Sequence, residues 1–270
     1  MCYNALGDGM DRNNIEKIAR NPEDRLLLAK LWDKINAGIR KNIPANTCFL
    51  SPRELEMARF LFGEPEGLYA FGGYGEAERK MLVYLPEYLE EDALYEEDAP
   101  CVCLRAEFYQ GDTLSHRDFL GALMGAGIGR ETVGDICVGK EHCDFFVTQE
   151  IAPYILQNFL SAGRAKLRLR QISLTEADIP QPEVKEIKDT MASLRLDSVI
   201  SSGFRISRSL AAQYVTTGKA AIDGLPCEKP DKAVAEGMKI SVRGLGKIKL
   251  HSVNGKTKKD RISVVIHRYI

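Results

Sequence analysis

The chain has 270 residues, 44% of them hydrophobic, and a mean hydropathy of −0.22. This length supports two or three small domains with separate cores, and no apolar run approaches the roughly 20 residues of a membrane-spanning helix. The opening stretch, MCYNALGDGMDRNN, lacks the basic and apolar regions of a signal peptide. Seven cysteines are an odd number in a chain too large for a disulfide scaffold. We therefore expect a cytoplasmic protein with reduced thiols and no membrane partner.

The formal net charge of −1 conceals an uneven distribution. Residues 1–161 hold 16 basic and 27 acidic side chains, whereas residues 162–270 hold 21 and 11. Such asymmetry indicates a polyanion partner for the basic part. Lysines that only keep one face soluble would give the same counts, so charge alone leaves both interpretations open.

The segment 1–90 has the pattern of a small α+β domain. Apolar residues recur at helical intervals from Ile15 to Ile35, and Pro22 marks a new helix start. SPRELEMARFLFG reads as a helix with Ser51 as N-cap and Glu54 completing a capping box. GLYAFGGY and RKMLVYLP read as two strands. No residues of a chemical site stand out in this segment.

An acidic connector, PEYLEEDALYEEDAP, follows with seven carboxylates and no basic residue. It is interpreted as a solvated linker or helix face, with an interaction surface as the alternative. In both cases this stretch should avoid RNA.

The segment 91–175 reads as strand, helix, strand, strand, helix, strand, which is the ferredoxin-like (RRM-like) βαββαβ order. Its first helix, SHRDFLGALMGAG, is capped by Ser115. The strand HCDFFVTQE lacks the Gly and aromatic spacing with which RNA-recognition modules stack bases. We therefore expect Phe145 and Phe146 in the core or at a sheet edge, not as stacking platforms.

Apparent catalytic motifs in this segment fail on context. HRD at 116–118 lacks the Asn that a kinase catalytic loop places at the position of Leu123. Ser115, His116 and Asp118 are contiguous, whereas the members of a catalytic triad converge from separate elements. GAGIG at 125–129 follows a helix instead of a strand. We expect no catalytic residues, no cofactor and no small-molecule substrate.

One group of residues has the chemistry of metal ligands. Cys101 and Cys103 share a strand face and could join His142 and Cys143. Their spacing is not that of a zinc motif, and buried free cysteines are common. We expect no metal.

EADIPQPEVKEIKDT, residues 176–190, reads as a proline-containing linker before a domain at 191–270. RLDSVISSG forms a helix that ends at Gly203, with Arg195 outside its apolar face. RSLAAQYVTTG forms a second helix capped by Ser207 and stopped by Gly218. Four side chains of this second helix should face inward, namely Leu210, Ala211, Tyr214 and Val215.

Strands complete this C-terminal domain. KAAIDGLPCEKP reads as a strand with a tight turn at Asp223-Gly224. MKISVRG, KIKLHSV and DRISVVIHRYI are further strands, with a turn at Asn254-Gly255 and a lysine-rich loop, NGKTKKD. Helices packed on a small sheet are the expected result.

The polar residues of this domain favour nucleic acid. Residues 195–270 hold 15 basic and six acidic side chains. Ser207 and Arg208 place backbone N–H groups and a guanidinium at a helix N-terminus, which suits a phosphate, and Arg195, Arg205 and Lys219 are expected at the same end. The candidate RNA-binding residues are Arg195, Arg205, Ser207, Arg208, Lys219, Lys229 and Lys247.

A structural interpretation of the same residues stays open. Arg195 could pair with Asp197 or Asp189, and Ser207 could serve only as a helix cap. Both interpretations can hold together, but the structural one leaves the clustering of basic residues unexplained.

RLDSVISSGFRISRSLAAQYVTTGKAAIDGLPCEKP, followed by VAEGMKI, resembles the RNA-binding domain named after small-subunit ribosomal protein S-four. SHRDFLGALMGAGIGRETVGDICV resembles the middle domain of the YlmH-type proteins. Together the two resemblances cover about residues 100–245. They imply a non-catalytic factor of ribosome-associated quality control that binds ribosomal RNA of the large subunit with its peptidyl-tRNA. By motif position, Arg195 and Arg208 correspond to arginines that contact rRNA and tRNA in related domains.

Two rival functions come from other classes. An RNA-modifying enzyme of the pseudouridine synthase or methyltransferase type would need a catalytic domain, and no Gly-rich loop follows a strand as a methyltransferase requires. An adaptor that binds only proteins predicts no salt-dependent RNA binding.

Overall fold

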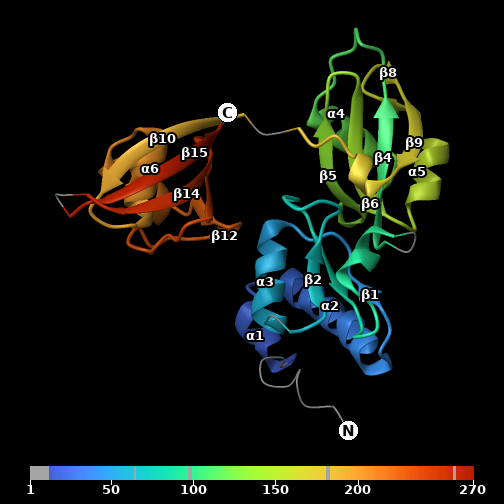
Figure 1. Cartoon of the computed structure of the whole chain (residues 1–270), viewed down its shortest axis with the longest axis horizontal. Helices are drawn as coiled ribbons and strands as arrows, with labels where there is room; N and C mark the ends of the chain where they lie inside the picture. Colours follow the sequence, from blue (N-terminus) through green and yellow to red (C-terminus); the bar gives the residue numbers. More distant parts are fainter. Residues whose placement is uncertain (1–11, 64, 97–98, 181–182, 258–259) are drawn as a thin grey trace. The chain divides into compact units, whose positions relative to one another are not determined.

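The computed structural model describes residues 12–63, 65–96, 99–180, 183–257 and 260–270. The chain is a mixed α+β protein with two compact units, Met1–Pro180 and Gln181–Ile270 (Figure 1). None of the helices in the described ranges is both long and apolar enough to cross a membrane. Lys258 and Lys259 of the lysine-rich loop lie outside the described residues.

The first part of the N-terminal unit packs helices beside a small sheet. Its helices are η1 (Arg12–Asn14), α1 (Ile15–Ile18), α2 (Pro22–Lys41) and α3 (Pro52–Phe62), followed by η2 (Glu91–Tyr95). Its strands are β1 (Ala45–Asn46), β2 (Leu68–Phe71) and β3 (Met81–Tyr84), in the antiparallel order β1-β3-β2. The predicted start of α2 at Pro22 is confirmed, and so is the capping box between Ser51 and Glu54.

The rest of this unit is built on a four-stranded antiparallel sheet. Its elements are β4 (Cys101–Glu107), α4 (His116–Gly125), η3 (Arg130–Thr132), β5 (Val133–Val138), β6 (His142–Thr148), α5 (Ala152–Asn158), β7 (Ser161–Ala162), β8 (Ala165–Lys166), β9 (Arg168–Ile172) and η4 (Leu174–Glu176). The strand order is β5-β6-β4-β9, and β7 pairs with β8 as a separate hairpin. The cap of α4 forms as predicted, because the Ser115 backbone N–H donates to the Asp118 carboxylate at 2.8 Å.

Both faces of this sheet are buried. One face packs against Phe119 of α4 and Ile155 of α5, because side chains alternate along the strands. On the other face Phe146 lies in a second core with Phe49 and Met81, which precede the sheet in the sequence. The surface that an open RNA-binding sheet would present is therefore filled by the first part of the same unit.

The described residues of the C-terminal unit form two helices and a six-stranded sheet. Its elements are β10 (Val184–Met191), α6 (Leu196–Phe204), α7 (Arg208–Thr216), β11 (Ala220–Ile222), β12 (Leu225–Pro226), β13 (Lys239–Val242), β14 (Gly246–Lys256) and β15 (Ile262–Tyr269). The antiparallel strand order is β10-β15-β14-β13-β11-β12. Asp223 and Gly224 form the predicted tight turn between β11 and β12, both with positive φ.

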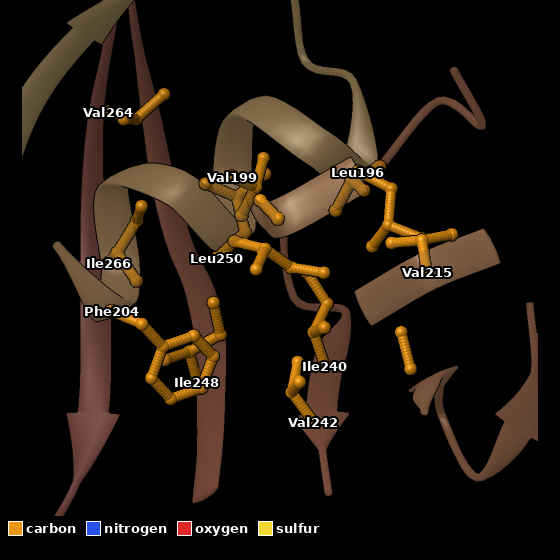
Figure 2. Packing of buried hydrophobic residues seen from close by; sticks show 14 of the residues in the cluster. Leu196, Val199, Phe204, Val215, Ile240, Val242, Ile248, Leu250, Val264 and Ile266 are labelled. Atoms are coloured by element: carbon orange, nitrogen blue, oxygen red, sulfur yellow. The ribbon is translucent and has the colours of Figure 1, made fainter. Parts of the chain in front are cut away.

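A single core joins the two helices to the sheet. Figure 2 shows side chains of α6 and α7 meeting those of β13, β14 and β15, all from one buried cluster. Gly203 permits the close approach of α6 to β14, because a Cβ there would lie 2.7 Å from Cδ1 of Ile248. Helices α6 and α7 therefore pack on one face of the sheet.

Two predictions about the strands of this unit were wrong. Residues 184–190 are not linker: they belong to β10, which pairs with β15 from Val184↔Tyr269 to Met191↔Ile262. Strand β10 buries only Ile187 and Met191, so its sequence shows no alternation of polar and apolar residues that would mark a strand. The turn predicted at Asn254-Gly255 is also absent, because both residues lie inside β14 beside a register shift.

Two predictions about the helices also need correction. Helix α6 does not end at Gly203 but at Phe204, with Arg205 as a left-handed C-cap at φ 55°. Leu210 does not face inward, since it is 40% exposed, whereas Ala211 and Val215 are fully buried as predicted. Leu210 therefore lies on a different side of α7 from Ala211 and Val215, which pack in the core.

Candidate nucleic-acid interface

The start of α6 is held by the segment that precedes β13. The backbone N–H groups of Leu196 and Asp197 donate to the carbonyl groups of Lys232 and Pro230, at 2.9 and 3.0 Å. Arg195, the N-cap, forms an isolated bridge with Ala233. This pairing fixes the position of the Asp197 side chain.

The Asp197 carboxylate is buried and accepts hydrogen bonds from two arginines. Nε and Nη2 of Arg195 each lie 3.3 Å from its oxygens, and those of Arg208 lie at 3.1 and 3.2 Å. Ser198 adds a hydroxyl at 3.2 Å. The predicted pairing of Arg195 with Asp197 is therefore present, and the same carboxylate also binds Arg208.

The charge state of Asp197 follows from these contacts. Burial by itself would raise the pKa of this carboxyl, but the hydrogen bonds from Arg195 and Arg208 outweigh it and leave the pKa below its ordinary value. The carboxylate is thus ionised at neutral pH, and the group of three side chains carries one net positive charge.

Both guanidinium groups keep donors for a ligand. A guanidinium has five N–H donors, and each of these two uses its Nε and Nη2 edge on Asp197. The side chains of Arg195 and Arg208 remain 39% and 55% exposed. Asp197 orients both guanidinium groups, which lowers the entropy lost when they bind a phosphate.

A groove of about 360 Å³ lies beside Arg208. Two more arginines line it, Arg205 and Arg261, together with Ser198 and Ser202. Arg261 is tied to the backbone carbonyl and hydroxyl of Thr190 on β10. Sequence reasoning missed Arg261, because only the pairing of β15 with β10 brings it to this site.

Arg205 occupies an unfavourable backbone conformation in this groove. Its φ of 55° lies in the left-handed region, where Gly and Asn are preferred at the ends of helices. Among the described residues, no side chain or carbonyl group pairs with its guanidinium. Packing alone does not explain why a long charged residue stands at this position.

Two other candidates lie near the same arginines. Ser207 caps α7 by accepting from the Leu210 backbone N–H at 3.2 Å, as the structural interpretation predicted. Lys229 is exposed and directly precedes Pro230, whose carbonyl group binds the start of α6.

The last two candidates lie elsewhere. Lys219 follows the C-terminal end of α7, whereas Arg208 begins the helix. The nine residues of the helix separate the two by roughly 13 Å. The prediction that Lys219 lies at the same helix end as Arg208 was therefore wrong. Its ammonium group lies 5.4 Å from the ring centroid of Tyr214. Lys247 alternates with the buried Ile248 and so lies on the sheet face that turns away from α6.

The candidate stacking and metal-binding residues of the N-terminal unit are buried. Phe145 and Phe146 are both fully buried, as expected for core residues. Cys101 and Cys103 lie in one core and Cys143 in the other, on opposite sheet faces. Burial raises the pKa of the Cys101 thiol to about 12. The described residues contain no cluster of three or more metal-ligating side chains.

Comparison with known proteins places the chain in a family. Ribosome-associated protein quality control protein P2 of Bacillus subtilis (strain 168) is 37% identical over 224 residues, which cover 82% of this chain and 86% of the relative. The chain belongs to the YlmH family. A family model described as "Putative RNA-binding domain in YlmH" matches residues 107–176. The solved structure of cell division protein ylmH from Streptococcus pneumoniae is 20% identical, with a TM-score of 0.48, and covers 60% of this chain and 98% of that chain.

Within the range matched by the YlmH family model, exposed basic residues lie on the edge strand β9 and in the hairpin that precedes it. Arg168 and Arg170 of β9 are exposed, and Arg164 and Lys166 precede them in the β7–β8 hairpin. Arg170 pairs with Glu107 at 3.4 Å. Glu107 is 44% exposed, so the carboxylate that pairs with Arg170 is not a buried anchor like Asp197.

Proposed function

We propose that this chain is a non-catalytic RNA-binding protein that contacts structured ribosomal RNA through the C-terminal unit. The observation that carries the proposal is the pair of arginines fixed on the buried Asp197 beside the groove of Arg205 and Arg261. Fixed guanidinium forks match the geometry of phosphate groups better than mobile lysines do. We call the set Arg195, Arg205, Arg208 and Arg261 the arginine surface.

The relative from Bacillus subtilis supports a ribosomal target, because it is named for ribosome-associated quality control. We propose that the chain acts in the same process in the cytoplasm, on the large ribosomal subunit with its peptidyl-tRNA. In this account the C-terminal unit is an RNA-binding domain of the S-four type, and the sheet of β4, β5, β6 and β9 with its helices is RRM-like. An RNA-modifying enzyme is the less favoured alternative, since the name of the relative describes quality control.

The decisive variant is Arg205→Asn. Asn tolerates the left-handed conformation better than Arg, so the free energy of unfolding should stay constant or rise. RNA affinity should fall by about 1.5–3 kcal/mol, the range for a lost hydrogen bond to a charged group. Affinity is measured by titrating a labelled rRNA fragment, and association by sedimentation with large subunits.

The matched control is Arg25→Gln. Arg25 is 60% exposed and pairs with Glu16 at 2.7 Å in the N-terminal unit, so its loss removes the same charge far from the groove along the chain. Equal affinity losses for the two variants would reduce the interaction to diffuse attraction and refute the arginine surface. Turnover of labelled cofactor on rRNA by the purified protein would refute the non-catalytic assignment.

A further inference from the structure

The sheet of the C-terminal unit has a second face, opposite α6 and α7. Side chains alternate along a strand, so the burial of Ile248 and Leu250 in the core places Lys247, Lys249 and His251 on the second face. The same alternation on β15 places His267 there, because Ile266 is buried.

Strand pairing brings the basic residues of this face together. Lys239 of β13 lies directly opposite Lys249, and on the other side of Lys249 lies His267. The rings of His251 and His267 are stacked, with centroids 3.9 Å apart and 12° between their planes. Lys247 lies 5.9 Å from the ring centroid of Tyr269. We call Lys239, Lys247, Lys249, His251, His267 and Tyr269 the lysine–histidine face.

This arrangement is unfavourable for the protein alone. Like charges directly opposite each other on neighbouring strands destabilise a sheet. Among the described residues, no carboxylate lies within ion-pair distance of Lys239 or Lys249. Glu186, which pairs in register with His267, forms its ion pair with Lys188 at 3.0 Å. An external anion would relieve the repulsion between the two lysines.

We propose that the lysine–histidine face is a second RNA-binding surface, separate from the arginine surface. The opposed lysines supply positive charge for consecutive phosphates, and the histidine stack and Tyr269 offer flat rings for unpaired bases. An acidic protein segment would match the charge of this face but would leave its ring surfaces unused. RNA is therefore the partner that fits the whole face.

The histidine stack adds a dependence on pH. Burial, the neighbouring His251 and Lys249 all lower the pKa of His267, and Glu186 opposes them. The nearby ion pair of Lys188 with Glu186 weakens that opposition. A bound phosphate favours the charged imidazolium, so the pKa of His267 should be higher in the complex than in the free protein. RNA affinity should consequently increase as pH falls from the pKa of His267 in the complex to its pKa in the free protein.

The test compares three double variants of the full chain, titrated with a labelled RNA hairpin and with a second hairpin of unrelated sequence. Lys239→Gln with Lys249→Gln removes the opposed charges and leaves a polar side chain that is one atom shorter. The slope of log affinity against log salt should become shallower by about two for both RNAs. Melting temperature should stay constant or rise, because the repulsion between the strands is removed.

Lys30→Gln with Lys34→Gln is the control, since both lysines are exposed on α2. A salt slope equal to that of this control would overturn the proposal. Lys239→Arg with Lys249→Arg keeps both charges, so the salt slope should equal that of the wild-type protein. A shallower slope for this variant would also overturn the proposal. An unchanged RNA slope with weakened binding of an acidic peptide would assign the face to a protein partner and refute RNA.

Parallel titration of Arg205→Asn separates this proposal from the proposed function. If Lys239→Gln with Lys249→Gln keeps the salt slope of its control while Arg205→Asn loses RNA affinity, only the second surface is refuted. If the lysine variant has a shallower salt slope while Arg205→Asn keeps its RNA affinity, only the arginine surface is refuted.

Discussion

The two largest sheets of this protein differ in how many of their faces are open. The sheet of β4, β5, β6 and β9 has the helices α4 and α5 on one face and the core around Phe49 and Met81 on the other. The sheet of the C-terminal unit has one core, formed with α6 and α7, and its opposite face carries lysines and histidines. The first sheet is thus packed on both faces. The second sheet is packed against α6 and α7 on one face and carries the lysine–histidine face on the other.

This difference separates fold from function. The RRM-like order that the sequence predicts would offer RNA an open sheet, but the face of this sheet opposite α4 and α5 is filled by apolar residues of the same unit. The C-terminal unit keeps two features that are unfavourable for stability, the left-handed Arg205 and the opposed pair of Lys239 and Lys249. Unfavourable residues that persist in a well-packed unit indicate binding.

The largest effect is expected from removing the C-terminal unit. Residues 1–180 should remain folded, because the two cores of the N-terminal unit contain only residues of that range. Sedimentation of this truncated chain with ribosomal particles should fall to background. The cut belongs after Pro180, because deletion from residue 191 would leave β10 without its partner β15. Circular dichroism reports folding, and retained sedimentation of the truncated chain would contradict the account.

A core substitution tests whether the N-terminal sheet is buried on both faces. Phe146→Ala should reduce the free energy of unfolding by about 3–5 kcal/mol, because the fully buried ring lies 5.2 Å from that of Tyr74. Phe60→Ala is the control: Phe60 is 64% exposed, so a change within about 0.5 kcal/mol is expected. Urea unfolding measures both. A small effect for Phe146→Ala would mean that this face is open.

Asp197 tests the anchor of the arginine surface. Asp197→Asn should lower the free energy of unfolding by about 1–3 kcal/mol and weaken RNA binding, because the two guanidinium groups lose their shared charged acceptor. Asp231→Asn, at an exposed carboxyl, should change neither. RNA affinity unchanged by Asp197→Asn would show that the arginines need no anchor.

The same variant has a defined pH dependence. The folded pKa of Asp197 lies below its unfolded value of about 3.9, so the carboxylate stabilises the fold above that pH. This contribution is lost as pH falls through the folded pKa. The difference in unfolding free energy between the wild-type protein and Asp197→Asn should therefore be constant near neutral pH and shrink in acid, which denaturant titrations at several pH values measure.

Local signals in the sequence predicted much of the fold. Ser51, Ser115 and Ser207 were each recognised as helix caps because the residues they bind lie three positions away. The Asp223-Gly224 turn was predicted for a similar reason, since both residues adopt positive φ within one tight turn.

Features that depend on distant partners were missed. Strand β10 was mistaken for linker because β15, the strand that pairs with it, lies far along the chain. Arg261 reaches the arginine surface through the same pairing. The pairing of Arg195 with Asp197 was foreseen as an alternative, but the contact of Arg208 with the same carboxylate was missed. That contact depends on how α6 and α7 pack. Tertiary contacts, unlike caps and turns, leave no local pattern.

The most direct test is a map of RNA cross-links on the full chain bound to large ribosomal subunits. Ultraviolet cross-linking followed by mass spectrometry should place nucleotide adducts on the peptides that contain Arg195 to Arg208 and Arg261, at the groove of the C-terminal unit. Adducts confined to residues 107–176, with none in residues 183–270, would contradict the claim that RNA is bound by the C-terminal unit.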